Sequence, residues 1–127
     1  MGLDQYAFKV RNHAVISDTQ FKDEIDNKKT YEEIYYWRKV PALQGFMEKL
    51  YYEKGGKNTF NCESIRLYEE DLDKLKYAIE HNEMPVDTIG FFFGKHSEED
   101  MPSVLKFVKI AKKAIKEGDA VYYSSWW

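Results

Sequence analysis

Short segments rich in aromatic and β-branched residues, some of them alternating with polar positions, predict the strands of this chain. Five such segments occur, at residues 3–10, 34–39, 64–68, 89–93 and 120–126. In a strand, successive side chains point to opposite faces of the sheet. In the first segment, the alternation predicts that Tyr6, Phe8 and Val10 form the buried side. Aromatic rings are expected on both faces of the sheet.

Three longer segments repeat apolar residues every three or four positions, which predicts amphipathic helices. Their apolar stripes cover residues 43–51, 72–79 and 101–115. Pro41 precedes the first stripe, and proline is typical of a helix start. Gly55 and Gly118 follow the first and third stripes, where glycine is typical of a helix end.

The segment at residues 18–33 fits neither pattern and is largely polar. Its apolar residues are Phe21, Ile25 and Tyr31, too few to supply much of a core. We expect a surface excursion here, with one helical turn. The whole pattern predicts a single α+β domain over residues 1–127, with a mostly antiparallel sheet of four or five strands packed against three helices.

Composition supports one globular domain and argues against nucleic acid and membrane as partners. Hydrophobic residues make up 43% and charged residues 32% of the 127 positions. The 19 basic and 22 acidic side chains give a net charge of -3, which argues against general binding to nucleic acid. No signal-peptide pattern opens the chain, and no apolar stretch is long enough to span a membrane. We expect a cytoplasmic protein without a membrane partner.

The residues that most often carry chemistry form no familiar motif. A single Cys62 cannot form an intramolecular disulfide, and its two interpretations are a small buried side chain, which we favour, or a thiolate nucleophile. His13, His81 and His96 lack the spacing of metal ligands, so no metal site is predicted. Residues 55–58 (GGKN) lack the other positions of a phosphate-binding loop and predict a turn. No cofactor motif is present.

The aromatic strands either fill the core or line a groove, and the sequence leaves both interpretations open. Arg38 follows Trp37 within one of these strands. Its guanidinium must reach water, stack on a ring or pair with an acid such as Asp4 or Glu63, because an unpaired buried charge is costly. We predict a ligand-binding groove lined by Trp37 and Trp126. Its predicted residues are Asp4, Tyr6, Trp37, Arg38, Cys62, Glu63, Phe92, Ser124 and Trp126.

Several sequence blocks, in this order, resemble a family of small uncharacterised proteins that are common in bacteriophages and also found in bacteria. The blocks are MGLDQY at residues 1–6, YWRK at 36–39, CE at 62–63, GFFFG at 90–94 and YSSW at 123–126. Members usually carry a histidine-containing segment after the second block, whereas this chain has VPALQGF. The resemblance implies a phage origin, and therefore the cytoplasm of a host cell, but no particular activity.

Two classes of function remain. The first is a non-catalytic phage accessory protein that binds a host macromolecule or a small polar ligand, in host takeover or in defence against host immunity. The second is a small enzyme that uses Cys62 or a carboxylate in the aromatic groove. We favour the binding module, because no nucleophile–base pair, metal-ligand set or cofactor motif is evident.

Overall fold

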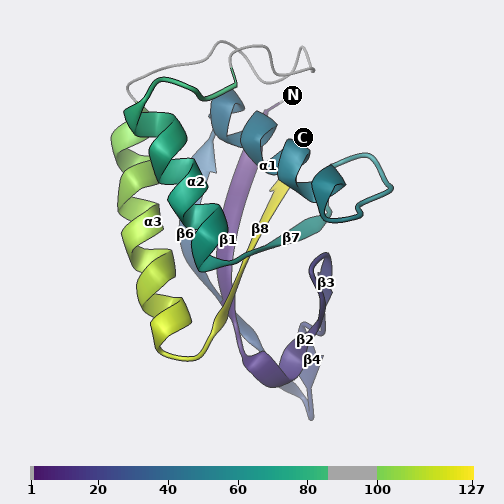
Figure 1. Cartoon of the computed structure of the whole chain (residues 1–127). Coiled ribbons are helices and arrows are strands. Elements are labelled where there is room, and N and C mark those ends of the chain that lie inside the picture. The colour runs from purple at the N-terminus through teal and green to yellow at the C-terminus, as the bar shows by residue number, and fades with distance from the viewer. Residues whose placement is uncertain (1, 86–99) are drawn as a thin grey trace.

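The computed structural model describes residues 2–85 and 100–127, which form an α+β fold around a four-stranded antiparallel sheet (Figure 1). The strand order is β6-β1-β8-β7. The bounds are β1 Asp4–Val10, β6 Tyr31–Arg38, β7 Ser64–Leu67 and β8 Ala120–Trp126. Four predicted strands and the α+β class are confirmed. The fifth predicted strand, at residues 89–93, lies outside the described residues.

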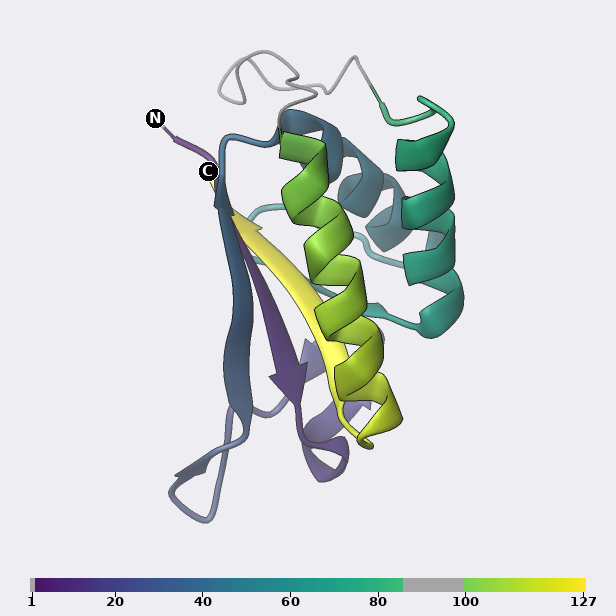
Figure 2. The same cartoon turned by 90° about the vertical axis from the view of Figure 1, so that its left-hand side faces the viewer.

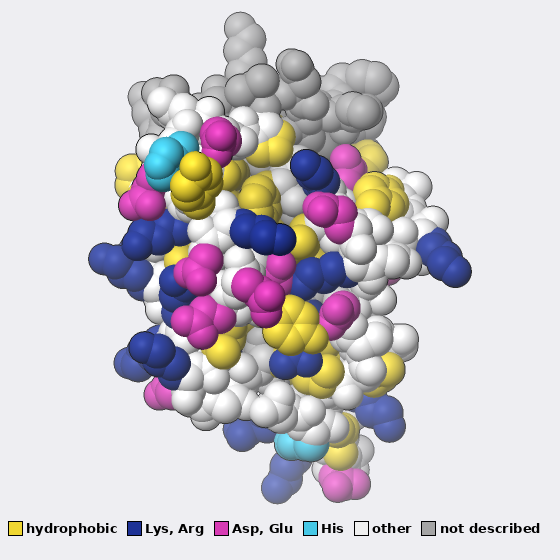
Figure 3. Space-filling model, in the orientation of Figure 1, with side chains coloured by type: hydrophobic (Ala, Val, Ile, Leu, Met, Phe, Trp, Pro, Cys, Tyr) yellow, Lys and Arg dark blue, Asp and Glu magenta, His cyan; other side chains and the backbone are white. Residues whose placement is uncertain are grey.

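The three predicted helices are confirmed and pack on the same face of the sheet (Figure 2). They are α1 Pro41–Glu53, α2 Glu69–Glu80 and α3 Met101–Lys116. Gly56, just after α1, must be glycine, because an added Cβ would come within 2.3 Å of the Tyr51 ring. Lysines, arginines and acidic residues are mixed over the outer surface of this helical layer (Figure 3). None of the described helices is long and apolar enough to cross a membrane.

The burial of β1 differs from the prediction at Tyr6 and Phe8, whereas Val10 is buried as predicted. Gln5 and Ala7 face the helices and are fully buried, whereas Tyr6 and Phe8 are only partly buried on the other face. Gln5 tolerates burial because its amide is fully used. Its Nε2 donates to the Val40 carbonyl oxygen at 2.9 Å, and its Oε1 accepts from the Val40 backbone N–H at 2.9 Å. The prediction was wrong because, from sequence alone, aromatic residues are expected to be buried and a glutamine is expected to be exposed.

We call the sheet face opposite the helices the open face, and one half of it is covered by short hairpins. The covering segment contains the 3-10 helix η1 Asn12–Ala14, the hairpin of β2 Val15–Ser17 and β3 Gln20–Phe21, and the hairpin of β4 Glu24–Ile25 and β5 Lys28–Lys29. Phe21 packs on Tyr122 of β8, with ring centroids 4.8 Å apart. The hairpins lie at the end of the sheet away from the two chain termini (Figure 1).

The hairpins correct the prediction for residues 18–33. In place of a helical turn, the segment contains β3, β4 and β5, and β6 begins at Tyr31 rather than at residue 34. Asp26 and Asn27 have φ angles of 52° and 61°, the left-handed conformation that two-residue hairpin turns require. Phe21 and Ile25 pack against a second core cluster on the open face, so the segment supplies part of the core.

Candidate functional site

The strand register brings five of the predicted site residues to the half of the open face that the described hairpins leave uncovered. Asp4 of β1 lies directly between Arg38 of β6 and Trp126 of β8. In the next row of that face, Tyr6 lies between Tyr36 and Ser124. Residues paired directly across antiparallel strands point to the same face. The two rows therefore present a guanidinium, a carboxylate and several aromatic rings side by side.

Two exposed rings flank β1 in this half of the sheet. Tyr36 is 45% exposed and Trp126 is 62% exposed. Tyr6 lies between their strands, with its ring centroid 5.3 Å from that of Tyr36 and the ring planes tilted by 48°. Large apolar rings left in water on a folded protein are informative when they gather at one place. We call Asp4, Tyr6, Tyr36, Arg38 and Trp126 the aromatic–acid patch.

Asp4 is joined to one ring of this patch, that of Tyr36, by a direct hydrogen bond. The Tyr36 hydroxyl donates to Asp4 Oδ1 at 2.5 Å, and this bond is the main reason that the pKa of Tyr36 is raised above its ordinary value. Burial, and then the carboxylates of Asp4 and Glu33, raise the pKa of Tyr6. Asp4 thus helps to raise the pKa of both phenols, whereas the charge of Arg38 lowers the pKa of Tyr36.

Arg38 avoids the cost of an unpaired buried charge because its side chain reaches water. Its side chain is exposed and its guanidinium lies over Gly2, where an added Cβ would come within 3.3 Å of Arg38 Nη2. Among the described residues, no ion pair joins Arg38 to Asp4 or Glu63. The cation and the Asp4 carboxylate thus stay separately available on the same face.

Trp37 does not belong to this face, and the predicted groove between Trp37 and Trp126 is wrong. Trp37 pairs with Gln5 and faces the helices, where it is only 4% exposed. Its ring packs against Phe107 with centroids 4.9 Å apart, and its Nε1 donates to Ser103 Oγ at 3.2 Å. The residue is one position from Tyr36, and the alternation of strand side chains sends the two rings to opposite faces.

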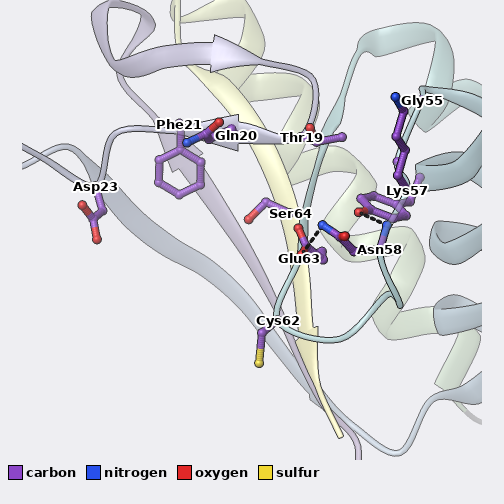
Figure 4. A pocket seen from close by; sticks show the side chains of 12 residues that line it. Thr19, Gln20, Phe21, Asp23, Gly55, Lys57, Asn58, Cys62, Glu63 and Ser64 are labelled. Atoms are coloured by element: carbon purple, nitrogen blue, oxygen red, sulfur yellow. Dashed lines mark hydrogen bonds between the residues drawn. The ribbon is translucent and has the colours of Figure 1, made fainter.

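A polar cleft of about 620 Å³ adjoins the open face at the β7 edge (Figure 4). The β3 hairpin forms one wall, and the loop after α1 forms the other. Of the predicted site residues, Cys62 and Glu63 line this cleft. Ser64, also in the lining, pairs with Ser124 of β8. The cleft therefore borders the row that contains Tyr6 and Ser124.

Cys62 is exposed, so the favoured prediction of a buried side chain is wrong. Its backbone N–H donates to the Ser125 carbonyl oxygen at 2.8 Å, and its φ of 62° places it in the left-handed region. This tight connection before β7 turns the thiol outward. Among the described residues, the hydrogen-bond partner of the thiol is Asn61 Oδ1, at 3.7 Å.

Two polar side chains hold the floor of the cleft in place. Glu63 Oε1 accepts from Asn58 Nδ2 at 3.1 Å, and the Glu63 carbonyl oxygen accepts from Ser124 Oγ at 3.0 Å. Both bonds tie the loop before β7 to its neighbours. Of the remaining predicted site residues, Phe92 lies outside the described part of the chain.

Tyr36, one of the two exposed rings of the patch, is absent from the site predicted from sequence. The signal was present: Tyr36 lies two positions before Arg38, and residues two apart in a strand share a face. Thr19, Phe21 and Asn58 of the cleft were also missed, because only the fold brings the hairpin and the loop together. In the described part of the chain, no cluster of three or more His, Cys, Asp or Glu side chains could hold a metal ion.

Comparisons with protein-family models, with curated proteins and with solved structures find no match for this chain. The resemblance to phage proteins therefore stays a prediction.

Proposed function

We propose that the protein is a non-catalytic binding module that takes a small polar ligand or a side chain of a partner protein on its open face. The observation that carries this proposal is the row Arg38–Asp4–Trp126 beside the row Tyr36–Tyr6–Ser124, on the half of the open face that the described hairpins do not cover. Aromatic rings supply contact area and have few rotamers to immobilise on binding. The charged and hydroxyl groups between them fix the orientation of the ligand.

The arrangement favours binding over catalysis. Cys62 is the alternative nucleophile, but within the described residues its thiol bonds to an amide oxygen and not to a base that would activate it. The Asp4 carboxylate is a candidate acid or base, and it lies on an exposed face rather than in an enclosed site that excludes water. Electrostatic catalysis depends on such exclusion.

The biological setting of the proposal comes from the resemblance alone. A phage accessory protein acts in the cytoplasm of the host, and its natural ligand is then a host macromolecule or metabolite. The net charge of -3 argues against nucleic acid as the general partner.

A probe titration monitored by two-dimensional NMR tests the binding site. The probes are blocked amino-acid amides with basic, acidic, neutral and aromatic side chains, together with adenosine monophosphate. We expect at least one probe to shift the amide signals of Tyr6, Tyr36 and Trp126 and the Trp126 indole signal. Probe-induced shifts that are confined to the helical face would overturn the proposal.

Matched variants identify the ring that matters. Trp126→Ala should weaken the probe that binds by about tenfold, the loss expected for removing a central aromatic anchor. Tyr77→Ala is the control, since Tyr77 is 54% exposed on α2 and stacks on His81 away from the open face. Cys62→Ser should leave the affinity unchanged, because Cys62 lines the adjoining cleft, and a marked loss of affinity would extend the binding site into that cleft.

A further inference from the structure

The aromatic–acid patch has a charge preference that follows from its contacts. Asp4 Oδ1 accepts from the Tyr36 hydroxyl, which leaves Oδ2 without a described hydrogen-bond partner. Glu33 pairs with Phe8 and so points to the same face. Two carboxylates thus lie near the Tyr6 ring, and both contribute to the raised pKa of its phenol after burial.

Aromatic rings add to the negative potential of these carboxylates. The face of each ring carries the negative part of its quadrupole, and a cation within about 6 Å of the centroid is attracted to it. Tyr36 and Trp126 flank the strand that carries Asp4, so a ligand over Asp4 can contact both rings. Arg38 is the opposing charge, but its guanidinium is turned toward Gly2 at the end of the sheet.

Resting on the proposed function, we propose that the patch binds an arginine side chain of a partner protein. A guanidinium is flat, so it stacks on Trp126 or Tyr36, and its fork of N–H donors reaches Asp4 Oδ2 from the same position. A lysine ammonium could use the charge but not the stacking geometry. The net charge of -3 on the whole chain also attracts a basic partner surface.

The same rings could stack on a nucleobase, which is the main competing ligand. A nucleotide would bring its phosphate toward Asp4 and Glu33, with Arg38 as its one cationic partner in the patch. The two ligands therefore carry charges of opposite sign. The experiment compares the affinities of probes that differ in charge.

Three blocked tripeptides, with arginine, citrulline or lysine between two glycines, provide the test together with adenosine monophosphate. Citrulline keeps the shape of arginine and lacks its charge. In NMR titrations we expect the arginine peptide to shift the signals of Tyr6, Tyr36 and Trp126. It should bind about tenfold more tightly than the citrulline peptide, and more tightly than the lysine peptide.

Charge variants then test the assignment to these residues. Asp4→Asn keeps an oxygen for the Tyr36 hydroxyl and removes the charge, and it should weaken the arginine peptide by about five- to tenfold. Arg38→Gln removes a like charge and should strengthen that peptide by about twofold. Tyr77→Ala should change neither, and the dispersion of the amide spectrum confirms that each variant is folded.

Several results overturn the inference. One is equal affinity for the arginine and citrulline peptides; another is arginine binding that Asp4→Asn leaves unchanged. If adenosine monophosphate binds at the patch and Arg38→Gln abolishes its binding, the arginine assignment fails while the binding function stands. If no probe shifts the open face, both proposals fail.

Discussion

Tyr36 and Trp37 are neighbours in β6, and they show how differently the two faces of the sheet are used. Trp37 lies under the helices, 4% exposed, with its Nε1 bonded to Ser103. Tyr36 lies on the open face, 45% exposed, with its hydroxyl bonded to Asp4. The helical face holds the larger core, whereas the described hairpins cover one half of the open face and leave Tyr36 and Trp126 exposed on the other half.

The difference shows that aromatic content in a strand has two distinct roles here. On the helical face, rings fill volume, and polar groups such as Gln5 are buried only with their hydrogen bonds satisfied. On the uncovered half, rings keep water contact and surround the Asp4 carboxylate. Substitutions on the first face should therefore change stability, and substitutions on the second should change binding.

The largest expected effect is that of Trp37→Ala. Truncation of a buried tryptophan leaves a cavity between β6 and α3, and we expect the free energy of unfolding to fall by about 3–5 kcal/mol. Urea denaturation measures it. Tyr36→Ala, one residue away, is the matched control and should cost about 1 kcal/mol or less. Equal losses in the two variants would contradict the division between the faces.

Gln5→Ala should have the next largest effect. The variant leaves the N–H and the carbonyl of Val40 buried without their partner, and it also removes the donor to the Tyr123 hydroxyl at 2.9 Å. Unsatisfied buried groups of this kind cost about 1–3 kcal/mol each, so we expect a loss of about 2–4 kcal/mol in urea denaturation.

The control for Gln5 comes from the same strand. Lys9 pairs with Glu32 at 3.2 Å near the surface, and both side chains are substantially exposed. Lys9→Ala should cost less than about 1 kcal/mol. If Gln5→Ala were equally mild, the buried amide network would not be a determinant of this fold.

The regular elements of the fold could be predicted from sequence because each depends on a local pattern. The apolar stripe and the acidic first turn of α2, and the proline at the start of α1, mark helices without any tertiary information. The four strands were found in the same way. The buried side of β1 could not be found, because the bonds that make Gln5 a core residue come from Val40, 35 positions away.

The candidate site could be predicted only in part for a similar reason. The residues Asp4, Tyr6, Arg38, Ser124 and Trp126 are brought to one face by strand register, which a single sequence does not contain. Trp37 was placed wrongly because its neighbour Arg38 suggested a shared site, while alternation separates the two. The outward turn of Cys62 depends on a bond to Ser125, 63 positions away, that no local pattern indicates.

The smallest expected effect concerns the covered half of the open face, where Tyr122 holds the β2–β3 hairpin. Its hydroxyl donates to the Ser17 carbonyl oxygen at 2.6 Å and to the Gln20 carbonyl oxygen at 3.2 Å. Tyr122→Phe should cost about 1 kcal/mol and should speed hydrogen exchange at the hairpin amides. Unchanged exchange in the hairpin would show that other contacts hold this cover.

The same tyrosine gives a pH dependence with a defined sign. Mainly through burial, the pKa of Tyr122 is raised from 10.0 to about 12 in the folded protein. An unfolded chain loses this proton near pH 10, whereas the folded chain keeps it, so rising pH favours unfolding between the two values. The stability advantage of the wild type over Tyr122→Phe should be complete below pH 10 and should shrink between pH 10 and about 12. Urea denaturation of both proteins across this range measures the difference, in which the titration of the other tyrosines and the lysines cancels. An advantage that stays constant up to pH 12 would mean that the Tyr122 hydroxyl is open to solvent and that the hairpin does not seal this half of the sheet.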